Sequence, residues 1–356
     1  MTSVDTGAMT ASPSLAAAGA RMPHEGDPHE RLWMAWPTAD YMLDGSTVPR
    51  DDALTAWAAV AHAAVAFEPV TMIVHPEQER IARRMLSRDV EIWAAPIDDA
   101  WLRDSGPTFV HRDSGPAVVD WVFNAWGGLV LAGTAHDAAI ARRVAAHAGV
   151  PVVPSALVAE GGGLHTDGDG TVLVTETVHL DPRRNPGWTR EQVDAELRRT
   201  VGAERVVWLS RGLTRDYGPY GTRGHIDMVA TFAAPGRVLL HAQRDPRHPD
   251  HAVTAQLRAE LQAETDARGR AFEIVELPAP RTLQDSEGWV DYSYVNHALV
   301  NGAVIACAFD DPADAEAAAI LAAAYPGREV VAVDARAIFA LGGGIHCITQ
   351  QQPARL

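Results

Sequence analysis

Apolar residues recur at helical spacing in five stretches of the chain, and a short apolar run follows each stretch. The helical patterns begin near Pro76, His136, Thr189, Pro249 and Asp311. Successive starts are 53 to 62 residues apart. The apolar runs, which are typical of β-strands, cover 90–97, 150–158, 205–210, 271–277 and 328–333. This regular spacing predicts one mixed β/α module of about 60 to 70 residues, used five times.

Local signals support parts of this pattern. Thr189 is a predicted N-cap, and Gln192 three residues later completes a capping box. Each apolar run is followed by a polar, Gly-rich loop and then by further strands, which we expect at 171–180 and 303–309. The segment 165–170 lacks the glycine register of a dinucleotide-binding turn and predicts a hairpin turn instead.

Two glycine-rich loops resemble each other. The segments 161–165 and 342–346 each contain three glycines, one apolar residue and a histidine. Glycine allows a close backbone approach where a β-carbon would clash. If the five modules close around an axis, equivalent loops meet at one end, and side chains that are distant in sequence come together there.

The amino-terminal segment differs from the rest of the chain. Residues 1–20 are rich in Ala, Ser, Thr and Gly and have neither a positive segment nor a long apolar core, so we predict a disordered leader rather than a signal peptide. Residues 21–356 are long enough for one large domain or two ordinary ones, and for a substantial core.

Composition excludes several functions. The formal net charge of -16 argues against nucleic-acid binding and against attraction to anionic membranes, and it favours a cationic ligand. All 30 basic residues are Arg, so neither a P-loop lysine nor a Schiff-base lysine exists. No apolar run is long enough to span a membrane. Two cysteines are too few for a disulfide framework, and we expect a reducing, cytoplasmic setting.

The polar loops contain the residues that could carry out chemistry. A nucleophilic cysteine, a histidine base and several carboxylates would meet if the loops converge. The polar or aromatic residues of these loops include Trp101, Arg103, Asp104, Glu160, Asp216, Arg223, His225, Asp227, Asp291, His346 and Cys347. Taken alone, Asp104 could cap a turn, the His225/Asp227 pair could bind a metal or lie on a strand surface, and Cys347 could be a core thiol.

An ordered set of motifs runs from residue 22 to near the carboxyl end. It comprises Met22-Pro23 with Glu25 and Pro28-His29-Glu30-Arg31, Trp33-Met34-Ala35-Trp36-Pro37, Phe67-Glu68-Pro69-Val70, Asp99-Ala100-Trp101-Leu102-Arg103-Asp104-Ser105-Gly106-Pro107, Phe123-Asn124-Ala125-Trp126-Gly127-Gly128, Glu160-Gly161-Gly162, Gly224-His225-Ile226-Asp227 and Gly342-Gly343-Gly344-Ile345-His346-Cys347. In this set the chain resembles the agmatine deiminase family, which is related to bacterial-type peptidylarginine deiminases within the pentein superfamily of guanidine-modifying enzymes. The resemblance implies a five-bladed αβ-propeller.

The resemblance also implies a reaction and a role for each motif residue. Asp104 and Asp227 would hold the guanidinium through charged hydrogen bonds, and Cys347 would attack its central carbon as a thiolate. His225, held by Glu160, would protonate the departing ammonia and then activate water. The expected reaction converts agmatine to N-carbamoylputrescine and ammonia without metal or cofactor.

Several positions depart from the family pattern and leave the substrate open. Gly344 stands where Asn commonly precedes Ile-His-Cys, and Arg223 stands where an uncharged or acidic residue is usual. Arg223 could face the ligand and favour a carboxylated guanidine such as arginine or a guanidino acid. Alternatively it pairs with a local acid such as Asp216, or points to solvent.

Other function classes also remain open. The same cysteine and histidine could serve an amidinotransferase, or the protein could bind guanidines without catalysis. We expect Cys307 to be a core strand residue, and His346 to line the site or to orient backbone. His24, Glu25, His29 and Glu30 match no closed zinc motif. The sequence leaves a homo-oligomer open.

Overall fold

The computed structural model describes residues 19–44, 48–128, 133–219, 221–286 and 288–355. Most of the predicted leader, residues 1–18, lies outside these ranges. Within them no helix combines the length and the apolar character needed to cross a membrane.

One strand pattern recurs within the described ranges. In each of four three-stranded sheets the first two strands are antiparallel and the last two are parallel. The first two sheets contain β4 (Thr108–Arg112), β5 (Gly115–Val122) and β6 (Val152–Val158), and β7 (Leu164–Thr166), β8 (Thr171–Thr175) and β9 (Arg205–Leu209). The other two contain β10 (Ala230–Ala234), β11 (Arg237–Ala242) and β12 (Glu273–Pro278), and β15 (Ala298–Val300), β16 (Ala303–Ala308) and β17 (Glu329–Asp334).

A further sheet joins the two ends of the chain. Its strands, in spatial order, are β18 (Thr349–Pro353), β1 (His29–Ala35), β2 (Val70–Val74) and β3 (Glu91–Ala94). Strand β18 is antiparallel to β1, while β1, β2 and β3 are parallel. This sheet therefore has the same antiparallel-then-parallel pattern, with its antiparallel strand supplied by the carboxyl end.

Helices connect the parallel strands, as parallel pairing requires a crossover. They are α2 (Arg50–Val65), α3 (Glu79–Met85), α6 (Ile140–Ala148), α8 (Arg190–Val201), α9 (Asp250–Ala263) and α10 (Asp314–Ala324). The shorter elements are α1 (Asp40–Leu43), α4 (Leu102–Ser105), α5 (Ala125–Gly128), α7 (Glu176–His179), α11 (Arg336–Ala340) and the hairpin β13 (Gln284–Asp285) with β14 (Gly288–Trp289).

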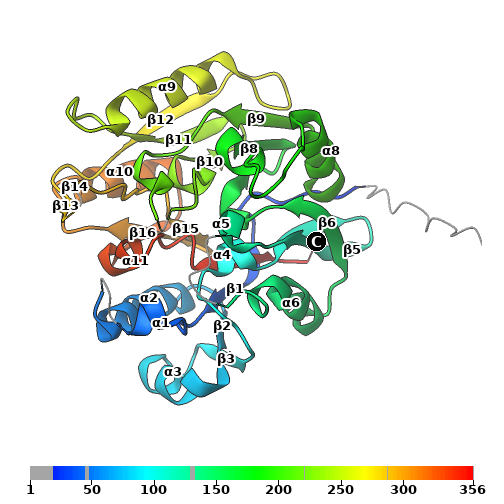
Figure 1. Cartoon of the computed structure of the whole chain (residues 1–356), viewed down its shortest axis with the longest axis vertical. Helices are drawn as coiled ribbons and strands as arrows, with labels where there is room; N and C mark the ends of the chain where they lie inside the picture. The colour runs from blue at the N-terminus through cyan, green and yellow to red at the C-terminus, as the bar shows by residue number, and fades with distance from the viewer. Residues whose placement is uncertain (1–18, 45–47, 129–132, 220, 287, 356) are drawn as a thin grey trace, which may run out of the picture.

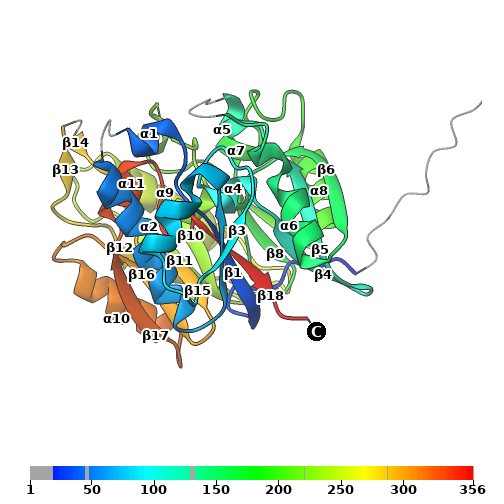
Figure 2. The ribbon, with the colours of Figure 1, turned by 90° about the horizontal axis from the view of Figure 1, so that it is seen from below.

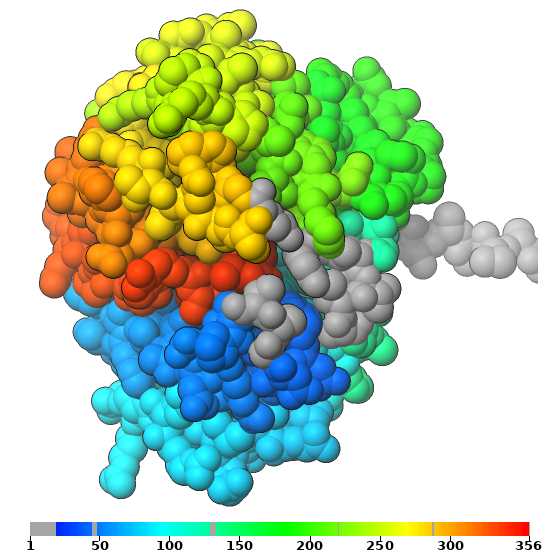
Figure 3. All heavy atoms as spheres, turned by 60° about the vertical axis from the view of Figure 1, so that its left-hand side comes forward, coloured from blue at the N-terminus to red at the C-terminus, as the bar shows by residue number. Residues whose placement is uncertain are grey.

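The units follow one another around the molecule in chain order. Figure 1 shows α3 at the bottom, α6 and α8 on the right, α9 at the top and α10 on the left. In the space-filling view of Figure 3 the last unit, in red, lies against the first, in blue. Figure 2 shows the short helices α1, α5 and α7 gathered along one side, with β18 and α10 toward the other.

Most of the predicted elements are present. Each of the five predicted helical patterns contains a helix, and each apolar run that follows contains a strand. The capping box at Thr189 and Gln192 is formed, and the turn after β7 connects a hairpin. The strand predicted over 171–180 is wrong at its end, because 176–179 is helix α7.

Candidate active site

The five predicted catalytic residues come from four separate parts of the chain and meet at one buried place. Asp104 belongs to α4, and Glu160 precedes the 3-10 turn Gly161–Gly163. His225 and Asp227 lie at the 3-10 turn Ile226–Met228, and Cys347 lies just before β18. All five side chains are buried.

His225 lies between two carboxylates. Its Nε2 is 3.2 Å from Glu160 Oε2, and its Nδ1 is 3.6 Å from Asp104 Oδ1. Burial lowers the pKa of His225, but the charges of Asp104 and Glu160 outweigh burial and raise it to about 9. The ring is therefore an imidazolium at neutral pH and can donate a proton.

Glu160 is fixed by a buried arginine as well as by His225. Arg184 Nε donates to both of its carboxylate oxygens, at 2.9 and 3.1 Å. Burial raises the pKa of Glu160, but Arg184 and His225 outweigh it and lower it to about 2. Glu160 therefore stays ionised and orients the imidazolium.

Cys347 has two polar neighbours within reach of its sulfur. Asn296 Nδ2 donates to Sγ at 3.2 Å, and Asp227 Oδ2 lies 3.5 Å from Sγ. Burial raises the pKa of the Cys347 thiol well above its ordinary value, and the charges of Asp227 and Asp104 raise it further. In this environment Cys347 is a neutral thiol, and a cation beside it is needed to form the thiolate.

Two carboxylates face the same space near the sulfur. Asp104 Oδ2 accepts a hydrogen bond from Trp126 Nε1 at 2.9 Å, and its Oδ1 accepts one from the Gly162 amide at 3.1 Å. Burial raises the pKa of Asp104 to about 6, against the opposing charge of His225. Burial also raises the pKa of Asp227, but the hydrogen bond and charge of His346, together with the charges of His225 and Arg103, outweigh it, and the net shift is downward.

Two buried polar atoms of the predicted catalytic residues have no hydrogen-bond partner among the described residues. They are Asp227 Oδ1 and His225 Nδ1. Orphaned buried polar groups are costly and rare in folded proteins, so they indicate where a ligand completes the hydrogen bonding. A planar cation with several N–H donors fits Asp227 Oδ1, and an amine leaving group fits His225 Nδ1.

Two glycines keep this space open. A Cβ added at Gly162 would lie 2.7 Å from both Asp104 Oδ1 and His225 Nδ1. A Cβ at Gly343 would lie 2.7 Å from the Trp101 ring and 3.1 Å from Cys347 Cβ. The Trp101 ring is therefore beside the nucleophile, and its Nε1 donates to Tyr41 Oη at 2.7 Å.

A model of the Porphyromonas-type peptidyl-arginine deiminase family matches residues 21–353. A Streptomyces coelicolor relative, provisionally classified as an agmatine deiminase, is 54% identical over 94% of this chain and 98% of its own. The agmatine deiminase of Stutzerimonas stutzeri is 40% identical over 94% of this chain and 96% of its own. The chain belongs to the agmatine deiminase family.

The fold agrees with this membership. The solved agmatine deiminase of Enterococcus faecalis superposes with a TM-score of 0.88 at 33% identity, over 95% of this chain and 97% of that chain. The resemblance predicted from the ordered motifs is confirmed. The mixed α/β class is confirmed as well.

Arg223, another predicted site residue, has partners outside the group of residues around Cys347. Its φ is 74°, its Nε lies 3.1 Å from Asp181 Oδ2, and its guanidinium stacks over the Tyr217 ring. It lines a cavity of about 320 Å³ with Glu176, Thr177, Leu180, Asp181, Pro182 and Ser210. Asp216 instead accepts hydrogen bonds from the backbone amides of Thr222 and Gly224. The described partner of the guanidinium is thus a local acid, and it is not Asp216.

Gly344 and Asn296 lie behind the nucleophile. A Cβ at Gly344 would lie 2.4 Å from Asn296 Oδ1 and 2.6 Å from the Phe339 ring, so this backbone packs against both side chains. Asn296 Oδ1 accepts from the amides of His346 and Cys347, at 3.0 and 3.4 Å. Sequence analysis did not select Asn296, because nothing in its own segment reveals that it contacts the Cys347 sulfur.

Trp126 also contacts the site and was not among the predicted site residues. Ala125, Trp126, Gly127 and Gly128 are consecutive left-handed residues, with φ of 56°, 52°, 84° and 92°. A left-handed conformation costs about 1–2 kcal/mol per residue with a side chain. This unusual backbone places Trp126 Nε1 on Asp104, and the only sequence signal for it was the family motif at 123–128.

A buried charged cluster lies beside Asp227. Glu25, His165 and His346 offer ligand atoms within 4.8 Å of one another, a spacing that a metal ion could use. Arg103 Nη1, however, donates to Glu25 Oε1 at 3.0 Å, and a guanidinium so close repels a metal cation. This cluster fits a hydrogen-bonded network better than a metal site.

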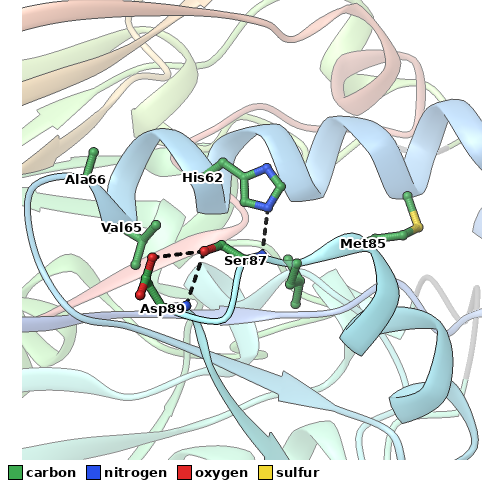
Figure 4. Close-up of a pocket in the computed structure, with 7 residues that line it drawn as sticks. His62, Val65, Ala66, Met85, Ser87 and Asp89 are labelled. Carbon is green, nitrogen blue, oxygen red and sulfur yellow. Dashed lines mark hydrogen bonds between the residues drawn. The ribbon is translucent and has the colours of Figure 1, made fainter.

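A second cavity contains none of these residues. It measures about 510 Å³ and is lined by His62, Val65, Ala66, Met85, Leu86, Ser87 and Asp89 (Figure 4). His62 Nε2 accepts from the Ser87 amide at 3.0 Å, and Ser87 Oγ donates to Asp89 at 3.1 Å. Its polar groups hold the loop before β3 against α2, and they bring together no nucleophile and base.

Proposed function

We propose that this protein hydrolyses the guanidinium of agmatine to a ureido group and releases ammonia. The enzyme is then a hydrolase of C–N bonds in linear amidines, as its named relatives are. The observation that carries the proposal is local to the site. Two polar atoms of the site, Asp227 Oδ1 and His225 Nδ1, are orphaned, and Asp227 Oδ2 lies 3.5 Å from the buried sulfur of Cys347, so a planar cation bound there would satisfy Asp227.

The first step is binding of the guanidinium. Asp227 and Asp104 accept its N–H groups, and the ligand's positive charge offsets the two carboxylates that raise the pKa of Cys347. The thiol then releases its proton to solvent water, and the thiolate, held by Asn296, attacks the central guanidinium carbon. Binding and activation of the nucleophile are thereby coupled.

The second step is loss of ammonia and hydrolysis. Imidazolium His225 gives its Nδ1 proton to the departing nitrogen, which leaves as ammonia and generates an amidino thioether cation on Cys347. The neutral ring then takes a proton from water, which adds to the same carbon. Breaking the carbon–sulfur bond releases the ureido product and restores the thiol.

We also propose an architecture for the whole domain. The five sheets with one strand pattern, arranged in chain order around the molecule, support a five-bladed αβ-propeller with the site at one end of its axis (Figure 1). The family match over 21–353 supports one domain from 21 to 356.

The position of Arg223 bears on which group the substrate carries at the end opposite its guanidinium. A carboxylated guanidine would require Arg223 to be free for the ligand, but its guanidinium faces Asp181 at 3.1 Å. This pairing favours agmatine, whose tail ends in an ammonium, over arginine or a guanidino acid.

The test is ammonia release from agmatine, 4-guanidinobutyrate and arginine, with Cys347→Ser as the control. We expect turnover of agmatine by the wild-type protein alone. Turnover restricted to a carboxylated guanidine would mean that the substrate is not agmatine, although the reaction would still be deimination. Amidine transfer to an added amine without ammonia would replace hydrolysis by a transferase reaction.

A further inference from the structure

The ring of His346 lies between two carboxylates. Its Nδ1 is 2.8 Å from Asp227 Oδ2, and its Nε2 is 3.0 and 3.1 Å from the two oxygens of Glu25. All three residues are buried. An ionised carboxylate only accepts hydrogen bonds, so both contacts require a proton on each ring nitrogen. The geometry is that of an imidazolium.

The surroundings keep both carboxylates ionised. Burial raises the pKa of Glu25, but His346, Arg103 and His165 outweigh it and hold it well below its usual range. Burial and Arg103 lower the pKa of His346, while Glu25 and Asp227 raise it, and the net shift is upward.

The ionisable groups that face His346 come from every element around it. They are Glu25 before β1, Arg103 on α4, His165 on β7, Asp227 in the 3-10 turn Ile226–Met228, His297 before β15 and the adjacent Cys347.

We propose that His346 is a positioning residue, which as an imidazolium bridges Glu25 and Asp227 and holds Asp227 ionised, with Oδ1 free for the guanidinium. This inference rests on the proposed function. Occupying Oδ2 with the His346 hydrogen bond leaves Oδ1 as the oxygen available to a ligand. The same Oδ2 lies 3.5 Å from Cys347 Sγ, so the His346 hydrogen bond also fixes the carboxylate beside the nucleophile.

Arg103 anchors the Glu25 end of this bridge. Arg103 donates from Nη1 to Glu25 at 3.0 Å, from Nη2 to Gln351 at 2.8 Å, and from Nε to the His346 carbonyl at 3.3 Å. Arg103 is the neighbour of Asp104, so the bridge connects the two carboxylates proposed to hold the substrate. A shift of His346 would thus disturb the spacing between them.

The direct test on the wild-type protein is the ¹⁵N spectrum of its histidine rings as a function of pH. We expect the His346 ring to keep protons on both nitrogens from pH 6 to pH 8. A His346 ring that becomes neutral below pH 7 would overturn the proposal. This readout needs no turnover, so it separates failure of the inference from failure of the proposed activity, which wild-type ammonia release reports.

Two variants separate the two hydrogen bonds. In His346→Asn the amide nitrogen can replace Nδ1 toward Asp227, and in His346→Gln it can replace Nε2 toward Glu25. We expect KM for agmatine to rise at least about tenfold in the Gln variant, with a smaller change in kcat, and to rise less in the Asn variant.

The pH dependence of kcat/KM distinguishes a positioning role of His346 from a merely structural role, which would leave this dependence unchanged. Without the imidazolium, burial raises the pKa of Asp227 toward that of Asp104. Two carboxylates then titrate over the acid limb of kcat/KM instead of one, so the limb becomes steeper and moves to higher pH in both variants. His165→Gln is the matched control, because His165 contacts Glu25 but not Asp227, and its acid limb should not move. Acid limbs that coincide with that of the wild type in both His346 variants would contradict the proposal.

Discussion

The glycine-rich loops at 161–166 and 342–347 share three glycines, an apolar residue and a histidine, yet their histidines have only Glu25 as a common partner. His165 Nδ1 accepts from the Phe232 amide at 3.3 Å, and its Nε2 lies 2.7 Å from Thr231 Oγ1. His346 has a carboxylate at both nitrogens. Glu25 Oε2 lies 3.5 Å from His165 Nε2, but only the His346 ring has a carboxylate at each nitrogen.

The positions that follow these histidines differ as well. Thr166 Oγ1 donates to the Thr171 carbonyl at 3.2 Å and accepts from the Gly168 amide at 3.1 Å, so it stabilises a hairpin turn. Cys347 instead has Asn296 and Asp227 at its sulfur. A repeated motif therefore fixes where a side chain lies, while the facing elements decide what it can do.

The largest effect is expected at the nucleophile. Cys347→Ser should lower ammonia release from agmatine by roughly 10³-fold or more, because a buried serine hydroxyl is not ionised by a neighbouring cation. Thr166→Ser is the matched change in the other loop, keeps the hydroxyl, and should leave the rate within about twofold. Comparable losses in both variants, measured on folded protein, would remove the functional contrast between the loops.

The next effect concerns the glycines. Gly162→Ala would place a methyl group 2.7 Å from Asp104 Oδ1 and His225 Nδ1, and we expect kcat/KM to fall by about 10²-fold. Gly163→Ala is the control, because its Cβ would meet Val178 Cγ1 at 3.2 Å and no predicted catalytic atom closer than 3.9 Å. Equal kcat/KM in the two alanine variants would show that Gly162 does not border the substrate.

A smaller effect is expected at Glu160. Its carboxylate helps hold the pKa of His225 at about 9, so in Glu160→Gln the His225 proton is lost at lower pH. The basic limb of kcat/KM should move to lower pH by about one unit, so kcat/KM should fall about tenfold at pH 10, where the pH exceeds both pKa values. Glu176→Gln removes an acid that pairs with Arg190 instead, and its profile should match the wild type. An unmoved basic limb in Glu160→Gln would contradict the assigned role.

The smallest effect is expected at Arg223, which is two residues from His225 in sequence. Because its described ion pair is with Asp181, Arg223→Gln should change kcat/KM for agmatine by less than about threefold. The ratio of agmatine to 4-guanidinobutyrate turnover should also stay the same. A tenfold change in that ratio would mean that Arg223 contacts the substrate tail.

Periodicity in the sequence predicted the helices that recur in each unit, but it did not predict helices α2 and α7. The amphipathic helices α6 and α8 have distinct polar faces and were found from spacing alone. Helix α2 was not predicted, because it is rich in alanine and buries Ala53, Leu54, Trp57 and Val60 among others, so it lacks a clear polar face. The segment 176–179 follows a buried strand without a break in polarity, which hid the start of α7.

The sequence predicted which residues form the site, but it did not predict the hydrogen bonds that connect them to their neighbours. Asp104, Glu160, His225, Asp227 and Cys347 were selected from motifs, and the fold brings them together. Glu25 and Asn296 are 322 and 51 residues from Cys347. Their contacts depend on how β1 and β15 pack, which no local pattern encodes. Trp126 depends on a left-handed backbone that side chains rarely adopt.

The most direct test of the central claim is the mass of the Cys347 peptide after acid quenching of the enzyme during agmatine turnover. The mechanism predicts an adduct with the mass of agmatine less ammonia on that peptide alone, absent in Cys347→Ser. Cys307, whose thiol pKa burial raises to about 12, should remain unmodified. Ammonia release at an undiminished rate in Cys347→Ser, with no adduct in the wild type, would contradict covalent catalysis by Cys347.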